Sequence, residues 1–285
     1  IRDGALAIDE VNDHDSLINE IYAACKLQMI EADTTISEAG LGQFEINLVH
    51  SHDAMKAADD AAFFKQIAKG VARKYGLAAS FMAKPYADRP GNGMHLHVSL
   101  LNGKGENVFD DGSDAGSPVL GHALAGGLAG LADSMLIFAP HQNSYRRFAI
   151  ESHAPMAVCW GYENRTAALR VPLGLPSQRR IEHRVSGADA NPYLVLAAIL
   201  GAILTGLEDQ KPPPPPITSS SYALDLPSLP SSWDDAINYF TNSSVIARIL
   251  PETLRDMLIG CKIQELHRFS GDISPFEYHS YLDQV

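Results

Sequence analysis

The sequence is poor in basic residues and has no apolar run long enough to cross a bilayer. Its 285 residues contain 22 Lys and Arg against 34 Asp and Glu, which gives a formal net charge of −12. A general nucleic-acid binder needs a basic surface to release phosphate counterions, so no nucleic-acid partner is expected. The longest uncharged stretch, residues 190–207, contains Asn191 and Pro192 and is shorter than the roughly 20 apolar residues of a membrane span. It predicts a buried helix and no membrane partner.

Cysteine is also scarce. Cys25, Cys159 and Cys261 are far apart and odd in number, which argues against a disulfide framework and against a zinc knuckle. A reducing, cytoplasmic location is therefore expected. The chain opens at Ile1 without an initiator methionine or a signal sequence, so we expect a fragment of a longer protein.

Hydrophobic residues make up 46% of the chain, which is enough for a core, and their spacing divides the chain into elements. Helices are predicted over residues 15–30 and 53–75, from Asn191 to about Gly206, from Ser232 onward and over residues 251–269. Residues 211–216, a lysine followed by five prolines, predict a stiff surface connection. Tyr222, in the loop behind it, is expected to be exposed.

Alternating apolar and polar residues predict three strands with one polar face each, over residues 43–48, 94–100 and 180–185. The polar faces hold Glu45 on the first strand, His95, His97 and Ser99 on the second, and Arg180, Glu182 and Arg184 on the third. Three strands bearing Glu, His and Arg rather than Ser, Thr and Lys indicate an enclosed polar site.

Two acidic residues bracket a turn. Glu38 and Glu45 flank the glycine-containing residues 40–42, which can bring two carboxylates to one point. Two solvated acids beside a loop is the alternative interpretation. With His95 and Glu182 the pair forms a set of hard oxygen donors plus one imidazole. Such a set suits Mg²⁺ or Mn²⁺ better than zinc, because thiolates are absent from it.

Arginines form a second group between residues 146 and 184. Guanidinium groups near apolar strands of an acidic protein indicate recognition of planar anions, either carboxylates or phosphates. Salt bridges to neighbouring glutamates would account for about half of them. Divalent-metal acids beside a cluster of arginines are the components of phosphoryl transfer. The arginines are Arg146, Arg147, Arg165, Arg170, Arg179, Arg180 and Arg184.

The glycines do not indicate a nucleotide-binding loop. Gly91 and Gly93 are not part of a GxGxxG pattern that opens a helix, so a dinucleotide-binding fold is excluded. Gly126-Gly127 has no following Lys-Ser/Thr and predicts close helix packing instead of a phosphate loop.

Seven segments occur in an order that resembles the catalytic domain of the glutamine synthetase superfamily. They are residues 38–45, 81–85, 91–100, 143–147, 164–172, 180–184 and 190–193. The resemblance implies an α+β fold in which a curved antiparallel sheet is covered by outer helices. Residues 1–285 would form one catalytic domain that includes the Pro/Ser-rich connection at 208–232. The family's small N-terminal domain and an early strand bearing further metal-ligand glutamates are not found before Glu38.

The resemblance also implies an activity, with ATP, glutamate and an amine as substrates and two Mg²⁺ or Mn²⁺ ions per site. The γ-carboxylate of glutamate would be phosphorylated and the amine would displace the phosphate. By the same resemblance, Glu38 and Glu45 would bind one metal ion and His95 with Glu182 the other. Gly91, Arg147 and Arg184 would bind glutamate, His97, Ser99 and Arg180 the nucleotide, and Arg165 and Arg170 its phosphates in a catalytic role. The family also implies a ring-shaped homo-oligomer with active sites between subunits.

Two departures from the family pattern point away from ammonia as the acceptor. Members that make glutamine carry a glutamate two residues before a proline in the segment after Asn-Ser-Tyr, and His153 occupies that position here. An imidazole is a poor trap for ammonium but can act as a base for a bulkier amine. Pro90 replaces an asparagine that is frequent in glutamine-forming members. The sequence thus predicts a γ-glutamylamide ligase acting on putrescine, a polyamine or a monoamine. The alternatives are glutamine synthetase and a non-catalytic relative.

Overall fold

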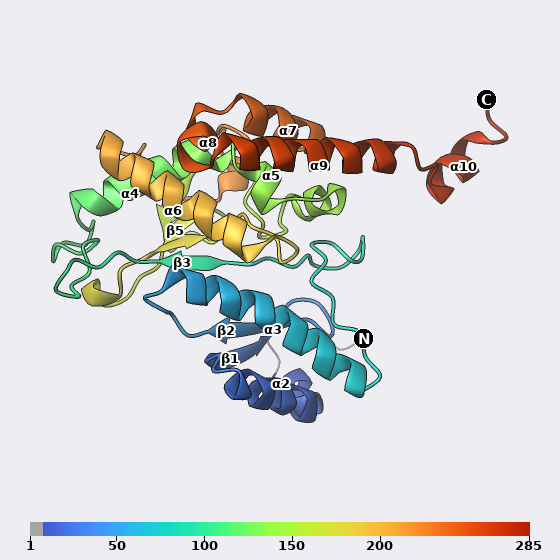
Figure 1. Cartoon of the computed structure of the whole chain (residues 1–285), viewed down its shortest axis with the longest axis horizontal. Coiled ribbons are helices and arrows are strands. Elements are labelled where there is room, and N and C mark those ends of the chain that lie inside the picture. Colours follow the sequence, from blue (N-terminus) through green and yellow to red (C-terminus); the bar gives the residue numbers. More distant parts are fainter. Residues whose placement is uncertain (1–7) are drawn as a thin grey trace.

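The computed structural model describes residues 8–285, and the opening at Ile1 lies outside the described residues. Figure 1 shows a hairpin and the helices packed on it at one end of the molecule, a small sheet in the middle and a group of helices beyond the sheet. The helices are α1 (Ile8–Asp13), α2 (Asp15–Leu27), α3 (Ala54–Lys74), α4 (Pro118–Leu131), α5 (Met135–Phe138), α6 (Pro192–Asp209), α7 (Trp233–Asn242), α8 (Ser244–Ile249), α9 (Glu252–Ser270) and α10 (Pro275–Tyr281). Short 3₁₀ turns are η1 (Gln142–Arg147), η2 (Pro176–Gln178) and η3 (Ser221–Ala223).

The strands form two small sheets. They are β1 (Ala32–Ser37), β2 (Phe44–Leu48), β3 (Leu96–Val98), β4 (Trp160–Tyr162), β5 (Leu169–Val171) and β6 (Ile181–His183). β1 and β2 pair as an antiparallel hairpin, and the other four lie in the order β3-β6-β5-β4. The α+β class is confirmed. Antiparallel pairing holds for β3 with β6 and for β5 with β6, whereas β4 and β5 pair in parallel.

The hairpin end of the molecule has its own apolar core. Helices α2 and α3 pack against each other, and their inward side chains meet the hairpin. The core side chains are Ile21, Cys25, Ile30, Ile67, Ala68 and Val71. The Asp53 carboxylate caps α3 by accepting from the backbone N–H of Met55 and Lys56. Helices α2 and α3 begin and end within a few residues of the predicted ranges 15–30 and 53–75.

The larger core lies where α4 crosses α6 above the four-stranded sheet. Gly126 and Gly206 form the crossing point. A Cβ atom at Gly126 would lie 2.2 Å from the carbonyl oxygen of Ala202, and one at Gly206 would lie 2.2 Å from that of His122. The prediction of close helix packing at Gly126 is thus confirmed.

Helix α6 is the predicted buried helix. Asn191 caps it by accepting from the N–H groups of Tyr193 and Leu194, and Pro192 occupies its first turn. Within residues 8–285 it alone is long and apolar enough to cross a membrane by length and composition. It packs against α3, α4 and α8, as a core helix does.

The proline-rich connection runs along the exposed edge of β4. The indole N–H of Trp160 donates to the carbonyl oxygen of Pro214 at 2.7 Å, and the N–H of Ile217 donates to the carbonyl of Trp160 at 2.9 Å. The connection is not helical, as predicted. It also covers a strand edge that would otherwise be open to pairing with another chain.

Candidate active site

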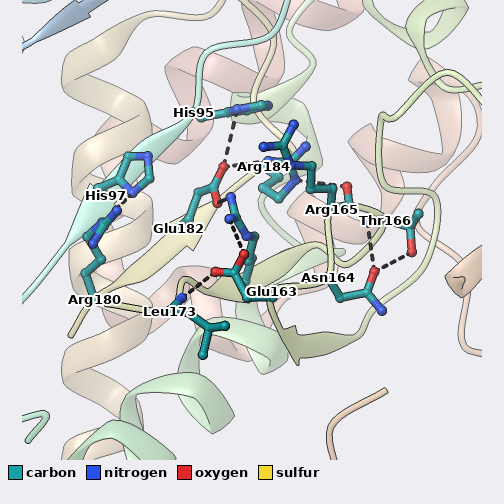
Figure 2. A network of polar contacts seen from close by, with 11 residues as sticks. His95, His97, Glu163, Asn164, Arg165, Thr166, Leu173, Arg180, Glu182 and Arg184 are labelled. Atoms are coloured by element: carbon teal, nitrogen blue, oxygen red, sulfur yellow. Dashed lines mark hydrogen bonds and ion pairs between the residues drawn. The ribbon is translucent and has the colours of Figure 1, made fainter. Parts of the chain in front are cut away.

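Glu182 lies at the centre of the polar network drawn in Figure 2. Its carboxylate accepts from Nη1 of Arg170 at 2.7 Å and from Nη1 of Arg184 at 2.5 Å. Nδ1 of His95 lies 3.5 Å from Oε1 of the same carboxylate. The Glu182 side chain is only 3% exposed, so these partners offset the cost of burying its charge. The predicted neighbours His95, Arg170, Glu182 and Arg184 are therefore brought together.

Two histidines on or next to β3 are held neutral near pH 7. Desolvation, together with the positive charges of Arg184 and Arg147, holds the pKa of His95 well below its usual range. Desolvation also lowers the pKa of His97, whose Nδ1 accepts from Nε of Arg180 at 3.1 Å (Figure 2). A neutral imidazole has a free lone pair, which a metal ion or a hydrogen-bond donor requires. His97 and Arg180, which the resemblance assigns to the nucleotide, therefore lie next to each other.

Glu38 and Glu45 face each other across the β1–β2 turn. Ser37 pairs with Phe44 and Ile36 with Glu45 in the hairpin register. Desolvation and the adjacent negative charge of Glu38 raise the pKa of Glu45, and Glu182 adds a further repulsion. Carboxylates crowded in this way favour binding of a proton or a metal cation between them.

Two side chains that the sequence analysis missed fix this turn. Glu10 on α1 accepts from the Ser37 hydroxyl and from the Gly42 N–H, both at 2.5 Å. The Gln43 amide donates to the carbonyl oxygen of Gly91 at 3.0 Å and to the side-chain oxygen of Asn92. Glu10 lies about thirty residues before its partners and carries no local motif, so periodicity could not have identified it. Gln43 lies in the segment 38–45, which resembles the glutamine synthetase superfamily, but the resemblance assigned it no role.

Arg147 is buried beside the predicted glutamate-binding residue Gly91. Its Nη1 donates to the carbonyl of Val185 at 2.7 Å and its Nη2 to that of Arg184 at 3.2 Å. A Cβ atom at Gly93 would lie 2.8 Å from Nη2, and one at Gly91 would lie 3.0 Å from Cγ, so both glycines make room for this side chain. Burial lowers the pKa of Arg147 to about 10, which leaves it charged at neutral pH.

The remaining predicted residues lie at the margin of the network. Arg165 is exposed and joins it through its carbonyl oxygen, which accepts from Nε of Arg184 at 3.1 Å. Ser99 follows β3 and is exposed. His153 is exposed and has a left-handed backbone with φ of +57°. Tyr222 was predicted to be exposed and is half-buried instead, because its hydroxyl donates to the carbonyl of Ala154 at 2.9 Å.

The acids and the imidazole fall into two pairs. Glu38 lies with Glu45, and His95 lies with Glu182. Within residues 8–285, no three His, Cys, Asp or Glu side chains converge closely enough to bind a metal ion by themselves. The repulsion that raises the pKa of Glu45 and the neutrality of His95 fit a divalent cation. Such a cation would take its further ligands from water or phosphate oxygens.

Comparison with known proteins identifies the family. The sequence profile described as "Glutamine synthetase, catalytic domain" matches residues 2–281. The chain belongs to the glutamine synthetase family. It is 40% identical over 271 residues to gamma-glutamylputrescine synthetase PuuA of Escherichia coli (strain K12), covering 95% of the chain and 57% of that protein. It is 36% identical to glutamate–isopropylamine ligase of a Pseudomonas species, covering 95% of the chain and 61% of that protein.

Solved structures of the family confirm the fold. The structure titled apo GmaS without ligand superposes with a TM-score of 0.90 at 30% identity, covering 99% of this chain and 66% of that one. A GmaS/ADP complex gives a TM-score of 0.88 at 30% identity, covering 96% of this chain and 65% of that one. The chain spans about three fifths of the length of the curated relatives that it matches. The residues assembled around Glu182 therefore belong to a glutamine synthetase catalytic domain.

Proposed function

We propose that the full-length protein is an ATP-dependent ligase that joins the γ-carboxylate of glutamate to an organic amine. The observation that carries this proposal is the placement of Glu182 between His95 and two arginines, beside the crowded Glu38–Glu45 pair. A carboxylate and the terminal phosphate of ATP repel each other. They react only where cationic groups neutralise both, and this arrangement of acids and guanidinium groups suits that task.

The reaction proceeds in two steps. A γ-carboxylate oxygen of glutamate attacks the terminal phosphorus of ATP, and ADP leaves with the electrons of the broken P–O bond. The amine nitrogen then attacks the γ-carbonyl carbon, loses a proton, and inorganic phosphate leaves. The products are a γ-glutamylamide, ADP and phosphate. An activated acyl group of this kind makes amide formation possible at neutral pH.

Each charged residue has a proposed role in these steps. Arg147 and Arg184 bind the glutamate substrate beside Gly91, and Arg165 and Arg170 stabilise the phosphoryl group in transfer. His97, Ser99 and Arg180 hold the nucleotide. Enzymes of this family use ATP and divalent metal ions. Glu38 with Glu45, and His95 with Glu182, would hold two Mg²⁺ or Mn²⁺ ions, which supply charge neutralisation when bound.

The acceptor is an organic amine in this proposal. Three relatives are named for putrescine, isopropylamine and ethanolamide, at 40%, 36% and 38% identity. His153, at the position where glutamine-forming members carry a glutamate, would accept the proton that the amine loses. Its side chain is exposed, so an amine can reach it.

We further propose that residues 1–285 act as one catalytic domain with the 208–232 connection inside it. A cytoplasmic location fits the free cysteines Cys25 and Cys159, both buried as thiols. A ring-shaped homo-oligomer is proposed from the family relation.

A panel of amines tests the proposal. The full-length protein is incubated with ATP, Mg²⁺ and glutamate, and phosphate release is followed with putrescine, isopropylamine, ethanolamine or ammonium. The expected result is faster release with an organic amine than with ammonium. Equal or faster release with ammonium would support glutamine synthetase instead, a function named for relatives at 35–36% identity. Absence of glutamate-dependent release under all conditions would favour the non-catalytic relative.

A further inference from the structure

Tyr222 on η3 contacts the segment that contains the predicted base, His153. Its hydroxyl donates to the carbonyl oxygen of Ala154 at 2.9 Å. The Ser152 hydroxyl and the His153 backbone N–H both lie close enough to the phenolic oxygen to oppose the rise in the pKa of Tyr222. The phenolic oxygen thus bonds to one residue of the segment formed by residues 149–155, which we call the flap, and lies near the two residues before it.

The flap backbone adopts conformations that need support. Glu151 and His153 have φ values of +63° and +57°, in the left-handed region that residues with a Cβ atom seldom occupy. Inside the flap, the Ser152 hydroxyl donates to the carbonyl of Ala149 at 2.6 Å. Strained residues persist only where surrounding contacts hold them, and Tyr222 supplies such a contact from another part of the chain.

Tyr222 is itself firmly attached to the arginine-bearing loop at 164–166. The N–H of Ser221 donates to Oγ1 of Thr166 and its hydroxyl donates to the Thr166 carbonyl, both at 2.8 Å. The Asn164 amide donates to the carbonyl of Ser219 at 2.8 Å. The η3 segment is therefore attached to the loop that contains Arg165.

Tyr222 also lies within electrostatic range of two site arginines. Arg184 and Arg147 both favour the phenolate and oppose the rise in the pKa of Tyr222 that its burial causes. Tyr222 in turn acts to raise the pKa of Arg147, against the larger effect of burial. The phenolic oxygen therefore lies in the electrostatic field of the proposed glutamate-binding arginines as well as in contact with the flap.

We propose that Tyr222 is a positioning residue that fixes the flap, and with it His153, at the amine end of the site. This inference rests on the proposed function. Without the phenolic hydroxyl, the Ala154 carbonyl loses its hydrogen-bond partner. The flap then samples other conformations, and the base is out of place for part of the time.

Hydrogen exchange tests the structural half of this inference without any turnover. Tyr222→Phe is made in the full-length protein, with Tyr239→Phe, an exposed tyrosine on α7, as the matched control. Loss of one hydrogen bond predicts roughly 5- to 10-fold faster amide exchange at residues 151–154 in the first variant only. Unchanged exchange at the flap would overturn the inference.

Steady-state kinetics test the functional half. Tyr222→Phe should lower kcat/KM for the amine roughly 10-fold and leave the KM for ATP within about twofold of wild type. An equal loss for all three substrates, or no loss for the amine, would overturn the positioning role. If the wild-type protein shows no amine-dependent turnover, the proposed function fails and the amine-site role falls with it, while the exchange result still decides whether Tyr222 holds the flap.

Discussion

The two faces of strand β6 place adjacent residues in opposite environments. Glu182 and His183 are each 2% exposed. Glu182 turns toward the site and is paired with two arginines. His183 turns toward the core, where its ring lies 4.3 Å from that of Phe138 and its Nε2 has no hydrogen-bond partner. It lines a small cavity of about 20 Å³ together with Ser134, whose hydroxyl is likewise unpartnered.

The difference shows how the site is supported. A strand buried on both sides can hold charges on one face only if the other face is anchored by packing, since residues alternate between the faces. The α4–α6 crossing and Phe138 provide that packing. The charged face is held by its own ion pairs, in which Arg170 and Arg184 neutralise Glu182.

The largest loss of activity and stability is expected from removing the carboxylate of Glu182, on the face of β6 that turns toward the site. In the full-length protein, Glu182→Ala leaves the buried Arg184 without its carboxylate partner, takes one of two carboxylates from Arg170, which keeps Glu163, and removes a proposed metal ligand. Amine-dependent phosphate release should fall at least about 100-fold, and Mn²⁺ titration should show weaker binding. The free energy of unfolding should fall by about 3 kcal/mol.

Glu182→Gln serves as the control for side-chain shape. It keeps the volume and removes only the charge, so it should retain more stability than Glu182→Ala while losing most of the activity. An unchanged metal titration in both variants would show that another carboxylate binds the ion.

A smaller loss of stability is expected from disturbing the α4–α6 crossing, which packs against the other face of the sheet. Gly126→Ala places a methyl group 2.2 Å from the Ala202 carbonyl, so α4 and α6 must move apart. The free energy of unfolding should fall by about 2–3 kcal/mol in denaturant titration. Gly260→Ala on α9 is the matched control, since a Cβ atom there meets nothing within 4 Å. It should raise stability by about 0.5 kcal/mol. Equal effects of the two substitutions would contradict the close crossing.

The smallest effect concerns the core histidine. Burial, aided by the charge of Arg147, lowers the pKa of His183 from 6.5 to about 3. The unfolded chain therefore binds a proton below about pH 6.5 that the folded protein does not, and stability falls as the pH drops toward 3. Between about pH 7 and about pH 5 this contribution is about 2 kcal/mol.

His183→Phe should remove that contribution, because a phenyl ring does not titrate. Urea titrations of both proteins at the two pH values measure the difference. The variant should lose less stability on acidification than the wild type, and parallel losses would show that His183 already carries a proton in the folded protein.

The two faces of β6 and the starts of several helices could be predicted from the sequence. Period-two alternation placed Glu182 and His183 on opposite faces, and the helices α2, α3, α6 and α9 begin within a few residues of their predicted positions. Alternation is local, so it overstated the lengths of β3 and β6, whose ends depend on which neighbours they meet. It also gave no indication of the parallel β4–β5 pair.

Contacts between distant parts of the chain were beyond the sequence patterns. Glu10 beneath the Glu38 turn, Gln43 bridging to Gly91, and Tyr222 on the flap all depend on tertiary structure. Tyr222 was placed in solvent because a loop behind a proline run is polar and exposed on average. In the structure, the hydrogen bond to the Ala154 carbonyl holds the Tyr222 side chain in a half-buried position.

Isotope transfer tests the central claim most directly. The full-length protein is given ATP, an organic amine and glutamate labelled with ¹⁸O in both γ-carboxylate oxygens. If glutamate attacks ATP before the amine attacks glutamate, one labelled oxygen stays on the phosphorus and the inorganic phosphate carries a single ¹⁸O. Unlabelled phosphate formed alongside γ-glutamylamide would contradict the account, because the γ-carboxylate would then never have been phosphorylated.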